Sequence, residues 1–171
     1  MTSFRELFDS GAPALLRYVR RLTGSRSDAE EIVQDTFLKL HRRMTEEAGD
    51  LTNARAWLFR VATNAARDLD RERRVRAREA QTAALDPTVI DFEAHIERRQ
   101  LTRRALRRLP SRMRQVLLLW SEGFTYREIA DITGIEPGYV GVLLQRARAA
   151  FRREYEALES GNPGRENNGL L

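Results

Sequence analysis

The side chains best suited to chemistry in this sequence lie on one predicted helix, residues 137–158, whose first half carries no charge. Between Glu136 and Arg146 there is no Lys, Arg, Asp or Glu. On a wheel of 3.6 residues per turn, Val142 and Gln145 share the face opposite the apolar stripe. A glutamine can form paired hydrogen bonds with adenine, and a valine can contact the methyl group of thymine. We therefore expect this face to enter a groove of duplex DNA.

Basic side chains around this neutral face can bind the phosphates of DNA. Arg127 lies on the preceding predicted helix, and Arg146 and Arg148 flank the face itself. Such contacts supply the salt-dependent part of the affinity without selecting a sequence. The candidate contacts to duplex DNA are therefore Arg127, Tyr139, Val142, Gln145, Arg146 and Arg148.

Small and apolar residues around this helix have the spacing of a helix-turn-helix. Ala130 is small where a second helix would cross, Gly134 suits a left-handed turn, and Val140 can pack the second helix onto the first. An ordinary helical hairpin with a glycine turn has the same pattern. Val142 and Leu143 could also form an apolar patch for a protein partner, so both alternatives remain open.

A second stretch, ARAWLFRVATNAARDLDRERR at residues 54–74, places aromatic residues beside arginines. Unpaired bases stack on aromatic rings while arginines contact the nucleic-acid backbone. Trp57 and Phe59 could serve as such rings. Burial in the core of a helical domain is the favoured interpretation for both.

A third stretch, SDAEEIVQDTFLKLHRRM at residues 27–44, predicts an amphipathic helix with Ser27 as its N-cap. Its outward face is acidic and polar, which suits a basic protein partner better than DNA. A solvated helix face with no partner is the alternative. The residues of this face are Asp28, Glu31, Gln34, Asp35 and Lys39.

Apolar residues recur at helical spacing along nearly the whole chain, and no stretch alternates as a strand does. We therefore predict an all-α fold. Apolar periodicity lapses around Asp86-Pro87, a pair that blocks helix continuation. The predicted organisation is two small helical domains, residues 1–79 and 95–158, joined by a flexible linker at 80–94. The second domain ends in the helix-turn-helix, and residues 159–171 are predicted to be disordered.

Composition limits the possible functions. The chain has 30 basic residues, of which only Lys39 is a lysine, and a net charge of +5, so acidic polymers are plausible partners. It has no cysteine, and His41 and His95 are isolated in the sequence. We expect no catalytic site, no metal, no cofactor and no small-molecule substrate.

The N-terminus does not resemble a signal peptide, and the longest apolar run, Val116 to Trp120, is too short to span a bilayer. A cytoplasmic protein without membrane insertion is expected.

These stretches together resemble the extracytoplasmic-function (ECF) sigma factors, the small two-domain members of the bacterial sigma-70 family. The resemblance covers roughly residues 4–158. The segments that carry it are DAEEIVQDTFLKL, RAWLFRVATNAARDLDRERR, LPSRMRQVLLLWSEGFTYREIADITGI and RARAAF, in that order along the chain.

The resemblance implies a role for each part of the chain. The acidic face of residues 27–44 would dock on the clamp helices of the polymerase β′ subunit, and the second domain would meet the β flap. The loop at 49–55 and the helix after it would melt the minus-10 element and hold a non-template base turned out of the stack. The helix-turn-helix would bind the minus-35 element, and an anti-sigma factor is an expected partner. The candidate minus-10 contacts are Asn53, Arg55, Asn64, Arg67, Asp68 and Arg71.

The sequence departs from this family at the outward face of residues 137–158. Members commonly carry a basic or hydroxyl-bearing run where this chain has Gly141, Val142 and Leu143, and a small residue or threonine where it has Tyr139. The identity of the minus-35 contacts therefore cannot be transferred residue by residue. An alternative function is a sigma-like interaction module that sequesters an anti-sigma factor through Val142 and Leu143.

Overall fold

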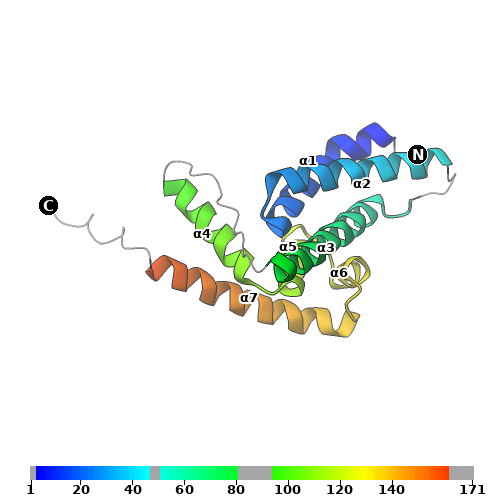
Figure 1. Cartoon of the computed structure of the whole chain (residues 1–171). Helices are drawn as coiled ribbons and strands as arrows, with labels where there is room; N and C mark the ends of the chain where they lie inside the picture. The colour runs from blue at the N-terminus through cyan, green and yellow to red at the C-terminus, as the bar shows by residue number, and fades with distance from the viewer. Residues whose placement is uncertain (1–2, 47–50, 81–93, 162–171) are drawn as a thin grey trace.

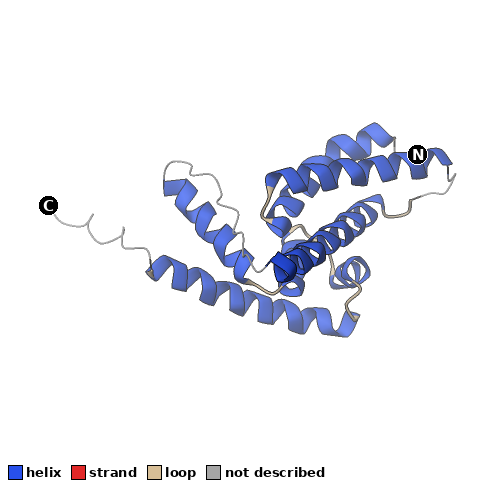
Figure 2. Ribbon diagram, viewed as in Figure 1, coloured by secondary structure: helices blue, strands red, loops and turns tan. Residues whose placement is uncertain are grey.

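The computed structural model describes residues 3–46, 51–80 and 94–161 and shows seven α-helices within these ranges (Figure 1). No strand occurs in this part of the chain (Figure 2), so the all-α prediction is confirmed. The predicted linker and tail lie almost entirely outside the described residues. The helices are α1 (Phe4–Thr23), α2 (Arg26–Glu46), α3 (Ala54–Ala80), α4 (Ala94–Arg108), α5 (Ser111–Ser121), α6 (Tyr126–Thr133) and α7 (Pro137–Ser160).

Helices α1, α2 and α3 pack together because each turns an apolar stripe inward. Tyr18 of α1 is fully buried, and its hydroxyl lies 2.8 Å from Oγ1 of Thr63 on α3. Burial raises the pKa of the Tyr18 phenol, which therefore stays neutral and hydrogen-bonded in the core. Phe37 and Leu40 bring the apolar side of α2 onto the same core.

The start of α2 differs from the sequence prediction. The helix begins at Arg26, and the side chain of Ser25 accepts a hydrogen bond from the backbone N–H of Asp28 at 3.4 Å. Ser27 therefore lies inside the first turn and is not the N-cap. A serine at either position satisfies the preference for an N-cap, so the sequence pattern could not choose between them.

Helices α4 to α7 form the second domain, in which the long α7 packs along α4 and α5 and is crossed by the short α6 (Figure 1). Leu119 of α5, Ile129 of α6 and Leu144 of α7 are buried together at its centre. A smaller cluster of Leu101, Ala105 and Leu158 fastens α4 to the far end of α7.

The two domains pack against each other through a continuous apolar core, which the sequence pattern did not predict. Helix α3 lies along α6, and α1 lies along α5. Phe59 of α3 is 1% exposed, and its ring centroid lies 4.8 Å from that of Phe124, just before α6. The favoured interpretation of Phe59 as a core residue is therefore confirmed, although the core that it joins spans both domains.

Candidate nucleic-acid interface

The turn between α6 and α7 has the backbone geometry that the sequence predicted for a helix-turn-helix. Thr125 and Glu128 form a reciprocal capping box at the start of α6. Gly134 ends α6 with φ of 69°, a left-handed conformation that glycine adopts without strain. Pro137 then begins α7 at a position where its missing N–H costs no helical hydrogen bond.

The outward face of α7 agrees with the helical wheel. Val142 is 44% exposed, and Gln145 is exposed on the same side. Leu143 is buried with Val140 against the rest of the domain. Of the two residues of the alternative apolar patch for a protein partner, only Val142 therefore lies on the surface.

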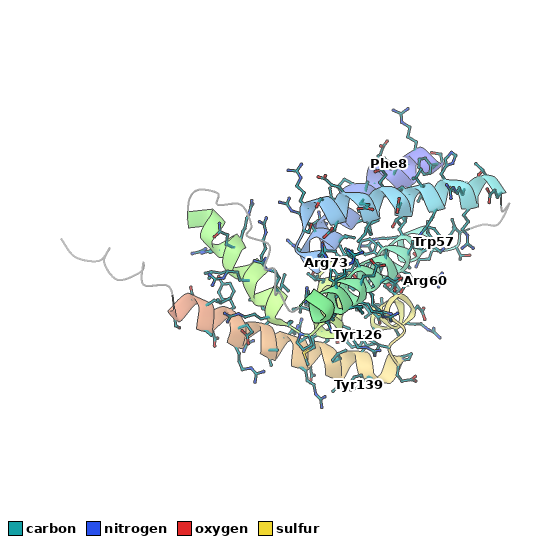
Figure 3. All side chains as sticks on the ribbon, in the orientation of Figure 1. Phe8, Trp57, Arg60, Arg73, Tyr126 and Tyr139 are labelled. Carbon is teal, nitrogen blue, oxygen red and sulfur yellow. The ribbon has the colours of Figure 1, made fainter. Side chains whose placement is uncertain are left out.

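The basic side chains around this face do not all have the same surroundings. Arg127 is exposed on α6. Arg146 donates a hydrogen bond from Nη1 to the hydroxyl of Tyr139 at 3.1 Å. Arg148 instead lies over the ring of Trp120 on α5, with Cζ 3.9 Å from the ring centroid. Figure 3 labels Tyr139 at the start of α7, next to Tyr126 of α6.

The predicted minus-10 contacts on α3 fall into two groups. Asn64, Asp68 and Arg71 are exposed. Arg67 is partly buried and donates to Oε1 of Gln115 at 3.3 Å and to the carbonyl of Thr133 at 3.0 Å, both in the second domain.

The residues at the start of α3 also form hydrogen bonds with the second domain. Asn53 caps α3 by accepting from the backbone N–H of Ala56, and its Nδ2 donates to Oε1 of Glu128 at 3.2 Å. Arg55 donates to the backbone carbonyl of Glu122 and lies over the ring of Phe124, 4.2 Å from its centroid. Three of the six predicted minus-10 contacts, Asn53, Arg55 and Arg67, are therefore bonded to the second domain.

Trp57 is half-buried and has the guanidinium of Arg43 5.6 Å from its ring centroid. Figure 3 labels Trp57 and Arg60 on the same helix. Of the two aromatic candidates for stacking, only Trp57 thus keeps part of its ring accessible.

The acidic face of α2 is mostly exposed, as expected for a docking surface. Glu31, Gln34, Asp35 and Lys39 are exposed. Asp28 is different, because its carboxylate, 17% exposed, is paired with Arg73 of α3. Leu38, 50% exposed, lies among these residues on α2 and was not predicted, because a leucine in an amphipathic helix is expected on the buried side.

Residues that join the domains were also missed by the sequence analysis. Glu122, with a side chain 8% exposed, forms two hydrogen bonds with Arg17 of α1 at 2.9 and 3.2 Å. These bonds raise the pKa of the Arg17 guanidinium. Arg114 of α5 donates to the carbonyl of Leu22 at 2.8 Å, and burial lowers its pKa. No periodicity links residues that are about a hundred positions apart.

Comparison with known proteins identifies the family. Residues 7–77 match the family model for Sigma-70 region 2, and residues 99–151 match that for Sigma-70, region 4. The ECF RNA polymerase sigma factor SigM of Mycobacterium tuberculosis is 32% identical over 162 residues, which cover 93% of this chain and 80% of SigM. The chain belongs to the ECF sigma factors of the sigma-70 family. This sigma factor therefore acts in transcription initiation with RNA polymerase and promoter DNA.

Further relatives agree with this assignment. SigL of Mycobacterium tuberculosis is 34% identical to the sigma factor over 160 residues, 90% of this chain and 89% of SigL. The sigma factor RpoE of Bartonella quintana, solved in complex with the anti-sigma factor NepR, shares the fold with a TM-score of 0.68 and 25% identity, over 93% of this chain and 98% of that one. CnrH, solved in complex with the cytosolic domain of CnrY, has a TM-score of 0.64 and 26% identity, over 93% and 89% of the two chains.

The described residues also bear on metal binding and membrane insertion. No group of three or more His, Asp or Glu side chains lies close enough together there to hold a metal ion. No described helix of the sigma factor has the length and apolar character needed to cross a membrane. His41 lies edge-on to the ring of Phe4, and the side chain of His95 lies outside the described residues.

Proposed function

We propose that this sigma factor binds the β′ clamp helices of core RNA polymerase through the exposed face of α2. The carboxylates of Glu31 and Asp35, with Gln34 between them, form a polar surface that is free of the chain's own core. The exposed Leu38 gives this surface an apolar contact beside the charges. A surface of this composition suits a basic partner, because charge steers the encounter and the apolar side chain adds burial.

In the same proposal, α3 binds the minus-10 element and α7 binds the minus-35 element. The observation that carries it is the difference between the two helix faces. The face of α7 presents the uncharged side chains of Val142 and Gln145, whereas that of α3 carries the amide and charged groups of Asn64, Asp68 and Arg71. The β flap would bind the second domain, and an anti-sigma factor would bind the closed pair of domains. The complex of RpoE with the anti-sigma factor NepR supports the last of these partners. The cytoplasm is the compartment in which these partners would meet.

Run-off transcription with purified core polymerase and a library of promoter sequences tests the function. We expect the full chain to join core and to yield transcripts only from promoters that share two short elements. A chain that joins core without promoter-specific transcripts would falsify this proposal and favour the sequestering module.

The docking surface is tested by Asp35→Arg, which places a cation where a basic partner is expected. We expect binding to core to weaken by about tenfold, or ~1.4 kcal/mol, with an unchanged helical content by circular dichroism. Asp9→Arg is the matched control, because Asp9 is exposed on α1 and lies outside all the proposed interfaces. Equal binding of both variants would exclude this face of α2.

A further inference from the structure

On the outward side of α7 one basic side chain is hydrogen-bonded to a neighbour on the same helix. Arg146 and Tyr139 are seven residues apart, which is two helical turns, so they lie on the same side of α7. Nη1 of Arg146 lies 3.1 Å from the tyrosine hydroxyl and donates to it. Tyr139 is 42% exposed, so this pair is on the surface and not part of the core.

This hydrogen bond leaves free the N–H donors of Arg146 that guanine recognition needs. A guanidinium has five N–H donors, and the bond to the phenol engages only Nη1. The edge formed by Nε and Nη2 still carries two parallel donors, which match O6 and N7 of guanine. A long arginine side chain loses rotamer freedom when it binds, and a neighbour that restricts it beforehand reduces that loss.

The other arginine on α7 that was predicted to contact DNA is held in a different direction. The guanidinium of Arg148 lies over the ring of Trp120 on α5, away from Tyr139. Positions 146 and 148 are about 200° apart around a helix, so Arg148 leaves α7 on the side opposite Tyr139, where its N–H donors suit a phosphate contact beside the groove. Arg146 is therefore the arginine positioned for a base contact.

Position 141 contributes no side chain to this face, because it is a glycine packed against Tyr126 of α6. A Cβ atom at Gly141 would lie 3.3 Å from Cε2 of Tyr126, so the tyrosine ring of α6 occupies the space where a side chain at 141 would start. Between Tyr139 and Val142 the helix thus presents backbone and an aromatic ring, not a second cation. The guanidinium of Arg146, hydrogen-bonded to Tyr139, is therefore the charged group that this face offers to a base edge.

On the basis of the proposed function, we propose that Arg146 recognises one guanine of the minus-35 element and that Tyr139 is the positioning residue that orients it. Tyr139 contributes to specificity through its hydroxyl, because that atom accepts from Arg146. Its ring need not touch the base.

The test uses the full chain with core polymerase and a promoter library randomised across the minus-35 element. Arg146→Ala is expected to lower the preference for guanine at one position by roughly fivefold to 150-fold. Tyr139→Phe, which removes only the hydroxyl, is expected to lower the same preference by about threefold to tenfold. In the R146A background the second substitution is expected to have no further effect, because the two residues act as one unit. Tyr155→Phe is the matched control, because it removes a hydroxyl from a tyrosine that lies sixteen residues further along α7 and outside this face.

Each of four results would overturn the proposal. An unchanged base preference in R146A excludes Arg146 as a base contact. A loss in Y139F that is equal for all bases, and that persists in the R146A background, assigns the hydroxyl to a phosphate instead. If the unmodified chain gives no promoter-specific transcripts, the proposed function fails and this proposal fails with it. Sequence-specific transcription by the unmodified chain together with unaltered variants refutes the Arg146–Tyr139 pair alone.

Discussion

Glu128 links two parts of the molecule with one carboxylate. Its Oε2 accepts from the backbone N–H and the hydroxyl of Thr125, each at 2.9 Å, and its Oε1 accepts from Asn53 at 3.2 Å. The backbone and side-chain bonds from Thr125 lower the pKa of Glu128 from its usual value of 4.5. The ionised carboxylate is therefore the form that the folded protein favours.

From this lowered pKa we predict a pH-dependent difference between the wild-type chain and Glu128→Gln. Because the folded pKa is below the unfolded value, the stabilisation is fully present above pH 4.5 and is lost as the pH falls through the folded pKa. The free energy of unfolding, measured with urea, should differ most between the two proteins near neutral pH and least near pH 3. The control is Asp131→Asn, an exposed carboxylate on the same helix. A difference that stays constant over this range would contradict the prediction.

For single side chains, the sequence predicted which side of a helix a residue faces better than it predicted which residues it contacts. The helical wheel placed Val142 and Gln145 outward, because a regular helix fixes the angle between successive side chains. It did not predict that Arg148 lies over Trp120 or that Arg67 bonds to Thr133. Those partners come from other helices, and their approach depends on tertiary packing that periodicity does not encode.

The helix-turn-helix shows how much an element depends on one backbone conformation. Gly134 has a positive φ, and a Cβ added there would meet no atom within 4 Å. A side chain at this position would therefore cost free energy through the left-handed backbone conformation alone, because it would meet no steric clash. The sequence predicted this turn because glycine at the end of an apolar helix is a local signal.

We predict that Gly134→Ala destabilises the protein by about 1 to 2 kcal/mol, the cost of holding an L-residue in the left-handed conformation. Urea denaturation followed by circular dichroism measures the change. Gly138→Ala is the control, because a Cβ there also meets open space and its φ is not positive. Equal stability of the two variants would show that the turn adjusts to the added side chain.

Over the whole molecule, the all-α fold was predicted from sequence and the closed arrangement of the domains was not. The apolar periodicity of a helix is a local signal that the sequence of that helix carries by itself. The contact between domains is made by Arg17 with Glu122, by Arg114 with the Leu22 carbonyl, and by Phe59 with Phe124. Each of these pairs joins residues far apart in sequence, and such pairing has no local signal.

The closed arrangement has a consequence for promoter binding. Asn53, Arg55 and Arg67 bond to the second domain, whereas Val142 and Gln145 on α7 are exposed. Binding of the minus-10 strand through the first three side chains requires those bonds to break. Binding of the minus-35 duplex through α7 does not.

We therefore predict that a chain held in the closed arrangement fails to initiate transcription. The chain has no cysteine, so Arg17→Cys with Glu122→Cys allows a reductant-cleavable bismaleimide to join the domains at their ion pair. The cross-linked protein should lose most of its promoter-specific transcription in a run-off assay with core polymerase, and cleavage of the linker should restore it. The control carries the same linker between cysteines replacing Arg5 and Asp9, an exposed pair within α1, and should keep its activity because no domain contact is fixed. Full transcription by the cross-linked chain would mean that the closed arrangement is compatible with initiation and that Asn53, Arg55 and Arg67 do not contact the promoter.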